Sequence, residues 1–183
     1  MKYLFSRRFL PLIILSFLSI PGFGQDFVRS RPPVCRCQFE MPGIPTSSSQ
    51  LITTDVGPIT YYSYVLEGSQ TGESFSCVVS YADYPEEAVA LDSTDFLEEF
   101  LTTSISQAVE QLNGVLIYST EIMEREYEGR LYRIDYGDGL SVKSKVFLAG
   151  RRFYLIQAFY QKDKEIGHRV DRFVDSFQIL PQP

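Results

Sequence analysis

The stretch IGHRVDRFVDSFQIL, residues 166–180, is a strong indication of the fold, because it closes the chain with a dense apolar segment. Chain ends usually fray unless they dock on the rest of the protein. The apolar residues of this stretch recur at three- and four-residue steps, which is the period of an amphipathic helix. The residues on this stripe are Val170, Phe173, Val174 and Phe177. We therefore expect a closing helix whose apolar face packs on a β-sheet, with Pro181 ending the run.

The sheet that this helix needs is indicated by segments in which apolar and polar residues alternate, as they do in half-buried strands. Strands are expected over residues 35–41, 49–55, 59–67, 74–82, 115–125, 130–136, 140–149 and 152–160. Two tight-turn sequences, YGDGL and AGRR, separate the last three of these strands. Glycine in such short connections is typical of hairpins between neighbouring strands.

The period changes to that of a helix across residues 94–113, where apolar residues again recur at three- and four-residue steps. Thr94 or Asp95 can cap the start of this helix, and Gly114 supplies the stop. The order of elements is therefore strands, helix, strands, helix. With hairpin-length connections late in the chain, this order predicts an α+β fold: a mostly antiparallel sheet packed against two main helices.

Four segments at strand ends, in a hairpin and at the chain end form a recognisable set. They are FEMPGIP (39–45), YADYP (81–85), VFLAGRRFYLIQA (146–158) and RFVDSFQIL (172–180). This set resembles the PsbP-like fold of photosystem II accessory proteins and of many bacterial exported proteins. The resemblance spans residues 35–180 and implies a three-layer sandwich with a central antiparallel sheet between helices. It carries over no catalytic residue, because the matching positions are packing and turn positions, and it implies a mostly non-enzymatic function.

The first 24 residues have the pattern of a secretory signal peptide. A basic start precedes a short apolar core at residues 9–20, and Gly22 and Gly24 stand at the −3 and −1 positions. We expect cleavage before Gln25, which would give a periplasmic or extracellular protein without a stable membrane anchor. The alternative is an uncleaved anchor, although the apolar core is short for a membrane span.

The rest of the chain is read as a linker followed by one domain. Residues 25–34 contain two prolines and no periodicity, so they predict a linker, and residues 35–183 predict a single α+β domain. The net charge of the 183 residues is −6, and it becomes −9 after cleavage because the signal peptide holds three basic residues and no acidic ones. This acidic balance argues against a nucleic-acid partner, since phosphate contacts require a basic face.

Several reaction chemistries lack the residues that they need. His168 is the sole histidine, so neither a multi-histidine metal site nor a Ser–His–Asp triad is expected. The sequence also lacks a G-x-S-x-G nucleophile turn and a phosphate-binding G-x-x-x-x-G-K-[ST] loop. We therefore expect no catalytic residue, no metal and no cofactor, and we interpret His168 as a solvated residue at the start of the closing helix.

The three cysteines are informative because an exported protein meets an oxidising compartment. Cys35, Cys37 and Cys77 are all predicted to face the core. We predict at most one disulfide, which joins Cys77 to Cys35 or Cys37. Two alternatives stay open: three buried thiols that act as small hydrophobic groups, and a soft-metal site of three thiolates.

Carboxylates support a first hypothesis about chemistry. Glu124, Glu126 and Glu128 alternate and are expected to face one side of a strand. Paired carboxylates serve calcium sites and the acid and base of glycosidases. A carboxylate-based hydrolase acting on a glycan is therefore one candidate function. The simpler interpretation is a charged, solvated edge strand that resists aggregation.

Charge segregation supports a different function. Residues 83–128 carry twelve acidic residues and one basic residue, whereas residues 129–152 carry six basic and two acidic residues. The candidate ligand- or partner-binding residues are Arg133, Lys143, Lys145, Arg151 and Arg152. If their strands are neighbours, they form a cationic patch; the alternative is a sheet face of local ion pairs. The favoured hypothesis is an exported, non-catalytic module that binds a protein partner of the envelope or a small anionic ligand.

Overall fold

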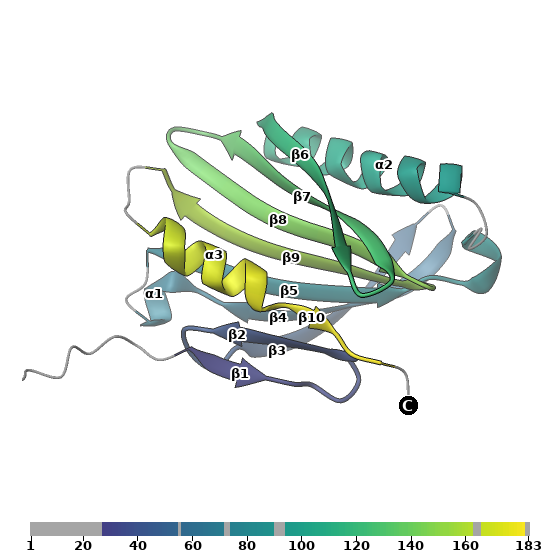
Figure 1. Cartoon of the computed structure of the whole chain (residues 1–183), viewed down its shortest axis with the longest axis horizontal. Coiled ribbons are helices and arrows are strands. Elements are labelled where there is room, and N and C mark those ends of the chain that lie inside the picture. Colours follow the sequence, from purple (N-terminus) through teal and green to yellow (C-terminus); the bar gives the residue numbers. More distant parts are fainter. Residues whose placement is uncertain (1–26, 55, 72–73, 90–93, 163–165, 182–183) are drawn as a thin grey trace, which may run out of the picture.

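The computed structural model describes residues 27–54, 56–71, 74–89, 94–162 and 166–181, which form two β-sheets with helices packed on them (Figure 1). The strands are β1 (Val28–Ser30), β2 (Cys37–Met41), β3 (Thr46–Thr54), β4 (Gly57–Leu66), β5 (Phe75–Asp83), β6 (Val115–Glu124), β7 (Tyr127–Tyr136), β8 (Leu140–Ala149), β9 (Arg152–Gln161) and β10 (Gln178–Ile179). The helices are α1 (Gly68–Thr71), the 3-10 turn η1 (Glu86–Ala88), α2 (Thr94–Leu112) and α3 (Gly167–Ser176). This arrangement confirms the predicted α+β fold with a large antiparallel sheet and two main helices.

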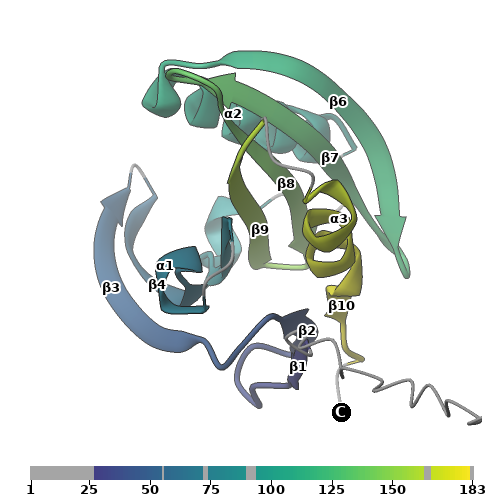
Figure 2. The same ribbon diagram turned by 90° about the vertical axis from the view of Figure 1, so that its left-hand side faces the viewer.

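The large sheet has the strand order β3-β4-β5-β9-β8-β7-β6, and each neighbouring pair is antiparallel. One row of directly paired residues crosses all of its strands. In order along the row these residues are Ser49, Tyr62, Tyr81, Tyr154, Phe147, Gly129 and Ile122. Figure 2 shows that the sheet curls, so that β3 and β6 lie at the two ends of an arc. The side chains of the row share one face of this curved sheet.

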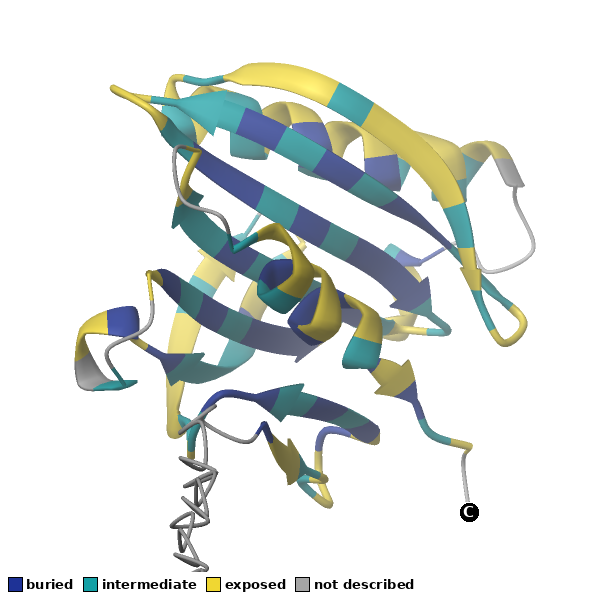
Figure 3. Ribbon diagram, turned by 60° about the vertical axis from the view of Figure 1, so that its left-hand side comes forward, coloured by how far each residue is buried: buried dark blue, intermediate teal, exposed yellow. Residues whose placement is uncertain are grey.

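Both faces of the large sheet carry part of the core, because successive side chains of a strand point to opposite faces. On one face, Val142 and Val146 of β8 belong to the cluster that contains Leu101 of α2. On the other face, Phe147 belongs to the cluster that contains Phe173 of α3. Figure 3 shows this alternation as buried and half-buried positions along the central strands, whereas β6 is mostly exposed.

The closing helix forms as the sequence predicts, and α3 buries Val170, Phe173 and Val174. The prediction is wrong at the end of the segment, because Phe177 has an extended backbone with φ −68° and ψ 132°. The last residues form β10, which pairs with β2. A strand edge offers these residues backbone hydrogen bonds that the end of a helix leaves unmade. Phe177 nevertheless stays buried, at 2% exposure, and its ring lies 6.1 Å from that of Phe147.

The end of α2 also differs in detail from the prediction. The left-handed residue after the helix is Asn113, with φ 48°, and not Gly114. Asparagine tolerates this conformation better than most residues. Gly114 is required for a different reason, since a Cβ atom there would lie 2.9 Å from the backbone oxygen of Asp135. The glycine therefore lets the start of β6 approach β7 closely.

The predicted linker at residues 25–34 is wrong over part of its length. Val28–Ser30 form β1, which pairs with β2 in the small sheet. Phe27 is only 9% exposed, and the guanidinium carbon of Arg172 lies 4.2 Å from the centre of its ring. The aromatic side chain and the strand pairing tie this segment to the domain. The expected signal peptide, residues 1–24, lies outside the described residues.

The disulfide joins Cys35 to Cys37, so the predicted bond to Cys77 is wrong. That prediction required the first cysteine strand to pair with β5, but β2 lies in the small sheet and β5 pairs with β4 and β9. Between the two bonded cysteines, Arg36 has a left-handed φ of 53°, which folds the chain into a turn. The Cα atoms of Cys35 and Cys37 therefore lie 5.1 Å apart. Cys77 is buried in the core and takes no part in the disulfide.

Thiol counting tests this pairing. The protein, unfolded without reductant, should show one reactive thiol per chain, and that thiol should disappear in Cys77→Ser. Cys35→Ser and Cys37→Ser should each show two thiols, because each removes one partner of the bond. A disulfide that is lost in Cys77→Ser would contradict the pairing.

Candidate functional site

A groove lined by tyrosines and serines lies between the β3–β4 hairpin and the turn that carries the disulfide. It encloses about 510 Å³. Its lining residues are Val34, Ser47, Ser48, Ser49, Tyr62, Tyr64 and Tyr81. Strand register creates this lining: Ser47 lies opposite Tyr64, and Ser49 lies opposite Tyr62. Directly opposite residues project from the same face of a sheet, so Tyr62 and Tyr64 each have a serine hydroxyl beside them. We call this site the tyrosine groove.

The aromatic rings of the tyrosine groove are held in fixed positions. Tyr62 and Tyr81 stack with their ring centres 4.8 Å apart and their planes 10° from parallel. The ring of Tyr64 contacts that of Phe39, with 5.6 Å between the centres. Burial raises the pKa of Tyr81 to about 12, so its phenol stays protonated at neutral pH. The groove therefore offers aromatic surface and neutral hydroxyl groups.

Arg152 joins one end of the tyrosine groove to the disulfide turn. Its guanidinium carbon lies 4.8 Å from the centre of the Tyr81 ring. Its Nη1 atom donates to the backbone oxygens of Val34, at 2.6 Å, and Cys35, at 3.0 Å. Its Nη2 atom donates to Oδ2 of Asp83 at 2.6 Å. These contacts make Arg152 a structural anchor of the groove wall.

Two further arginines lie near this anchor. The hydrogen bond from Arg152 lowers the pKa of Asp83; burial opposes that change, and the charges of Arg36 and Arg151 add to it. Arg36 and Arg151 are exposed to solvent. The charges of three guanidinium groups thus act on the carboxylate of Asp83, and one of them, that of Arg152, lies beside Tyr81 of the groove. We call Arg36, Arg151 and Arg152 the arginine corner.

The five basic residues predicted as one patch are divided between two places. Arg151 and Arg152 belong to the arginine corner. Arg133, Lys143 and Lys145 lie on β7 and β8, where Arg133 is directly opposite Lys143. The strands β7, β8 and β9 are neighbours, as the hypothesis required. The two groups of basic residues nevertheless have different acidic partners, so they are described separately.

Ion pairs neutralise the second group. Lys143 contacts Asp171 of α3 at 2.6 Å, and Lys145 contacts Asp175 at 2.8 Å. The acidic residues stand four positions apart on α3, so both face β8 from the same side of the helix. The alternative interpretation from the sequence, a face of local ion pairs, therefore describes these two lysines.

Arg133 belongs to a small polar network around Asp135. The carboxylate of Asp135 accepts hydrogen bonds from Arg133 Nε at 2.9 Å and from the Ser141 hydroxyl at 2.5 Å, and it pairs with Lys162 at 2.8 Å. Burial by itself raises the pKa of Asp135, but the hydrogen bonds from Lys162, Ser141 and Arg133 outweigh it and hold the pKa at about 2. The network therefore needs the ionised carboxylate.

This network predicts a pH-dependent stability. The pKa of Asp135 is lower in the folded protein than the usual 3.8. Its contribution to stability is therefore complete only above about pH 5 and is lost as the pH falls through the folded pKa. Urea unfolding of the wild type and of Asp135→Asn should show a stability difference at pH 7 that shrinks at pH 3 and becomes small at pH 2. A difference that stays constant over this range would contradict the assignment.

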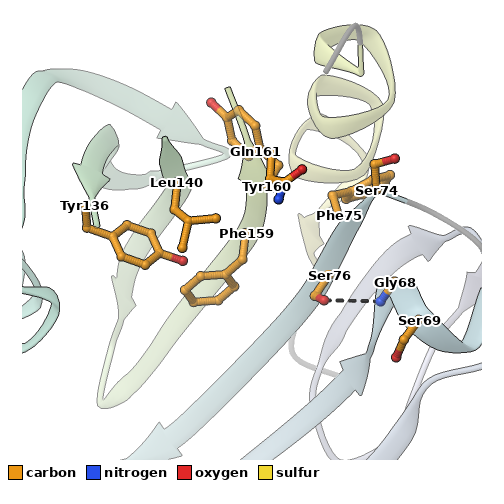
Figure 4. A pocket seen from close by; sticks show the side chains of 10 residues that line it. All are labelled: Gly68, Ser69, Ser74, Phe75, Ser76, Tyr136, Leu140, Phe159, Tyr160 and Gln161. Atoms are coloured by element: carbon orange, nitrogen blue, oxygen red, sulfur yellow. Dashed lines mark hydrogen bonds between the residues drawn. The ribbon is translucent and has the colours of Figure 1, made fainter. Parts of the chain in front are cut away.

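A second hollow, of about 350 Å³, lies near α1 at one end of the central strands (Figure 4). The backbone amide of Gly68 donates to the Ser76 hydroxyl there at 3.1 Å. Figure 4 shows the aromatic rings of Tyr136 and Phe159 opposite this hydrogen bond. Among the residues that the structure describes, the lining contains hydroxyl, amide and aromatic groups and no carboxylate, lysine or arginine.

A third hollow, of about 610 Å³, lies between α2 and β6. Its floor contains Arg130, whose side chain is only 7% exposed. Three carboxylates converge on this guanidinium: Glu98 of α2, Glu121 of β6 and Glu128 of β7. The carboxylates therefore face Arg130, and the geometry does not set them up as a facing acid and base.

The predicted row of glutamates is also wrong. Glu124 lies opposite Tyr127, so Arg125 and Glu126 form a two-residue hairpin turn, with Arg125 at φ 56°. Glu124, Glu126 and Glu128 consequently belong to two strands and a turn. In the part of the chain that the structure describes, no group of three or more His, Cys, Asp and Glu residues is placed to hold a metal ion. His168 is exposed in the first turn of α3.

Sequence reasoning missed the tyrosine groove. The tyrosines at 62, 64 and 81 were available as alternating residues of two predicted strands. What was missing was the pairing of β4 with both β3 and β5, which sets the three rings, Ser47 and Ser49 on a common face.

No family model and no curated protein matches this sequence. The structure is similar to the solution structure of cyanobacterial PsbP (CyanoP) from Synechocystis sp. PCC 6803, with a TM-score of 0.53 and 16% sequence identity. That match covers 88% of this chain and 97% of the other. A Pseudomonas aeruginosa protein of unknown function matches with a TM-score of 0.38 and 8% identity, over 78% of this chain and 88% of its own.

The comparison with CyanoP agrees with the four sequence segments that resemble this fold. At 16% identity it speaks to the architecture alone. None of the helices that the structure describes is long and apolar enough to cross a membrane. From the architecture that it shares with CyanoP, we conclude that the chain has a PsbP-like fold.

Proposed function

We propose that this chain is an exported, non-catalytic binding module that holds a small anionic ligand with a flat ring in the tyrosine groove. One observation carries the proposal: the stacked pair of Tyr62 and Tyr81 ends at the arginine corner. A flat ring can lie on the half-buried rings of Tyr62 and Tyr64 while its acidic group meets the guanidinium groups of Arg36 and Arg151.

The chemistry of the tyrosine groove supports this class of ligand. Aromatic faces bind flat apolar surfaces, and a phenol at the edge adds a hydrogen-bond donor. Serine hydroxyls both donate and accept, so the Ser47 and Ser49 side can bind the hydroxyls of a sugar ring or a carboxylate. Arginine recognises carboxylate and phosphate groups in a fixed two-pronged geometry. Together these groups favour an aromatic acid, or an acidic sugar whose ring lays an apolar face of C–H groups on the tyrosines.

The proposal includes the finer architecture, a three-layer sandwich in which α2 covers one face of the large sheet and α3 the other. It also includes cleavage before Gln25 and a periplasmic or extracellular location. N-terminal sequencing of the secreted protein should read Gln25 or its cyclised form; a mature protein that begins at Met1 would contradict export by cleavage.

The test is calorimetric titration of the mature chain with trigalacturonic acid, with 4-hydroxybenzoate and, as a neutral comparison, with galactotriose. At least one acidic probe should bind, and the neutral sugar should bind much more weakly. Tyr62→Ala should weaken binding about tenfold, a loss of about 1.4 kcal/mol. Arg151→Gln should weaken it as well and should flatten its dependence on salt, since exposed charges are screened by salt.

Matched controls separate the site from general effects. Tyr118→Ala removes a half-buried tyrosine from β6, and Arg29→Gln removes an exposed arginine from β1; both should leave binding within twofold of the wild type. Equal weakening by the controls, or no binding of either acidic probe, would contradict the proposal. New reducing ends after incubation with trigalacturonic acid would instead support the glycan hydrolase.

A further inference from the structure

The strand β6 forms one edge of the large sheet and carries an unusual amount of exposed apolar surface. It stands last in the strand order, with β7 as its neighbour. Four large apolar side chains are exposed along it: Val115 at 65%, Leu116 at 40%, Ile117 at 48% and Met123 at 63%. Edge strands offer a row of backbone N–H and C=O groups to a further strand, and exposed apolar surface favours such pairing.

The outer part of β6 is divided by an irregularity. The register shifts between Leu116 and Tyr118, which leaves Ile117 as an extra residue without a partner in β7. Such a bulge twists a strand and interrupts its hydrogen-bonding pattern. The regular edge therefore runs from Tyr118 to Glu124, and the apolar residues 115–117 lie beyond one end of it.

The surroundings of this edge are acidic. The hollow of about 610 Å³ between α2 and β6 is lined by Glu98 and Glu121 as well as by Arg130. The side chain of Glu121 is 78% exposed and that of Glu98 is 58% exposed, whereas that of Arg130 is 7% exposed. The negative charges thus reach solvent while the positive charge stays inside. Glu124 adds a further carboxylate at the end of the strand.

We propose that β6 is the docking edge for an extended, cationic segment of another protein, which adds a strand along Tyr118–Glu124. Backbone pairing would supply the affinity, and the carboxylates of Glu121 and Glu124 would select lysine or arginine side chains. Apolar residues of the same segment would cover Ile117 and Met123. This surface is separate from the tyrosine groove, which belongs to the opposite end of the sheet.

The charges favour this occupant over a second copy of the chain. Pairing of β6 with β6 of another copy would bring two acidic edges together, and like charges on neighbouring strands are destabilising. The other edge of the sheet, β3, has the sequence TSSSQLITT, which contains no charged residue. It therefore has nothing with which to select a cationic partner.

The test uses a synthetic seven-residue peptide of lysine and valine, together with two altered forms. Its lysines stand at both odd and even positions, because Glu121 and Glu124 are three residues apart and therefore face opposite sides of the sheet. One form replaces lysine by glutamate; the other carries N-methyl groups at alternate backbone amides, which block strand pairing and keep the charge. The lysine peptide should bind the mature chain. Both altered forms should bind at least ten times more weakly.

Amide hydrogen exchange locates the bound peptide. The lysine peptide should slow exchange at least tenfold at outward-facing amides of residues 118–124 and should leave β3 unchanged. Protection of β3, or of neither edge, would overturn the proposal. Equal binding of the N-methylated peptide would also overturn it, because charge alone would then explain the interaction.

A pair of matched double variants tests the selection by charge. Glu121→Gln with Glu124→Gln should weaken the lysine peptide about tenfold. Glu86→Gln with Glu87→Gln, which removes the same charge from η1, should change binding less than twofold. Equal weakening by the two double variants would show that the overall negative charge, and not the β6 edge, attracts the peptide.

Discussion

Phe173→Ala should lower the free energy of unfolding by about 3–5 kcal/mol, the usual cost of truncating a buried phenylalanine. The Phe173 side chain is fully buried, at 0% exposure, and belongs to the core cluster that α3 shares with β2, β8 and β9. Truncation leaves a cavity where the helix meets both sheets. Because β10 follows α3 directly and pairs with β2, a poorly packed helix should also loosen the chain end.

Urea unfolding at pH 7, followed by circular dichroism, measures this loss. His168→Ala is the matched control, because it truncates an exposed ring in the same helix. The control should change stability by no more than about 0.5 kcal/mol, as is usual for surface sites. A change of that small size in Phe173→Ala would mean that α3 does not close the core.

Gly129→Ala should cost about 2–3 kcal/mol, at the upper end of what one added methyl group costs in a packed core. A Cβ atom at residue 129 would clash with the ring of Phe147 and with the backbone oxygen of Val146. The ring can move only at the cost of its own packing, because it stacks with Phe177 at 6.1 Å. The backbone oxygen cannot move without breaking the ladder between β7 and β8.

Gly167→Ala is the matched control for this substitution. Gly167 is the first residue of α3, and a Cβ atom there would meet open space. Alanine favours helix over glycine, so the control should be neutral or slightly stabilising. A double variant with Phe147→Ala gives a further check: adding Gly129→Ala should cost less when the ring is absent. An equal cost with and without the ring would show that the ring is not the obstacle.

These two predictions concern one continuous feature. Gly129 and Phe147 belong to the row of residues that crosses the large sheet and reaches Tyr81 and Tyr62 in the tyrosine groove. Tyr154 lies between Phe147 and Tyr81 in the row, and its hydroxyl donates to the backbone oxygen of Cys35 at 2.8 Å. The groove wall therefore rests on the same core that α3 closes.

Patterns in the sequence predict the kinds of the main elements and their approximate positions. The two-residue alternation predicted the strands of the large sheet, and the three- and four-residue period predicted α2 and the body of α3. These patterns are local, because the side chains of one element must face one core. The acidic balance and the segregation of charge were also legible without a structure.

Which of these elements meet is visible in the three-dimensional structure and not in the local patterns. Gln38 and Gln178 bond to each other across 140 residues of sequence, and Arg152 reaches Val34 across 118. Such long-range pairing places β2 in the small sheet, away from β5, so that Cys35 bonds to Cys37 and not to Cys77. It also brings Lys143 and Lys145 to aspartates of α3 and sets three tyrosines along one groove. A periodic pattern states which face of a strand is buried, but it does not state which neighbour covers that face. That choice is made by the total packing and hydrogen bonding of the whole chain.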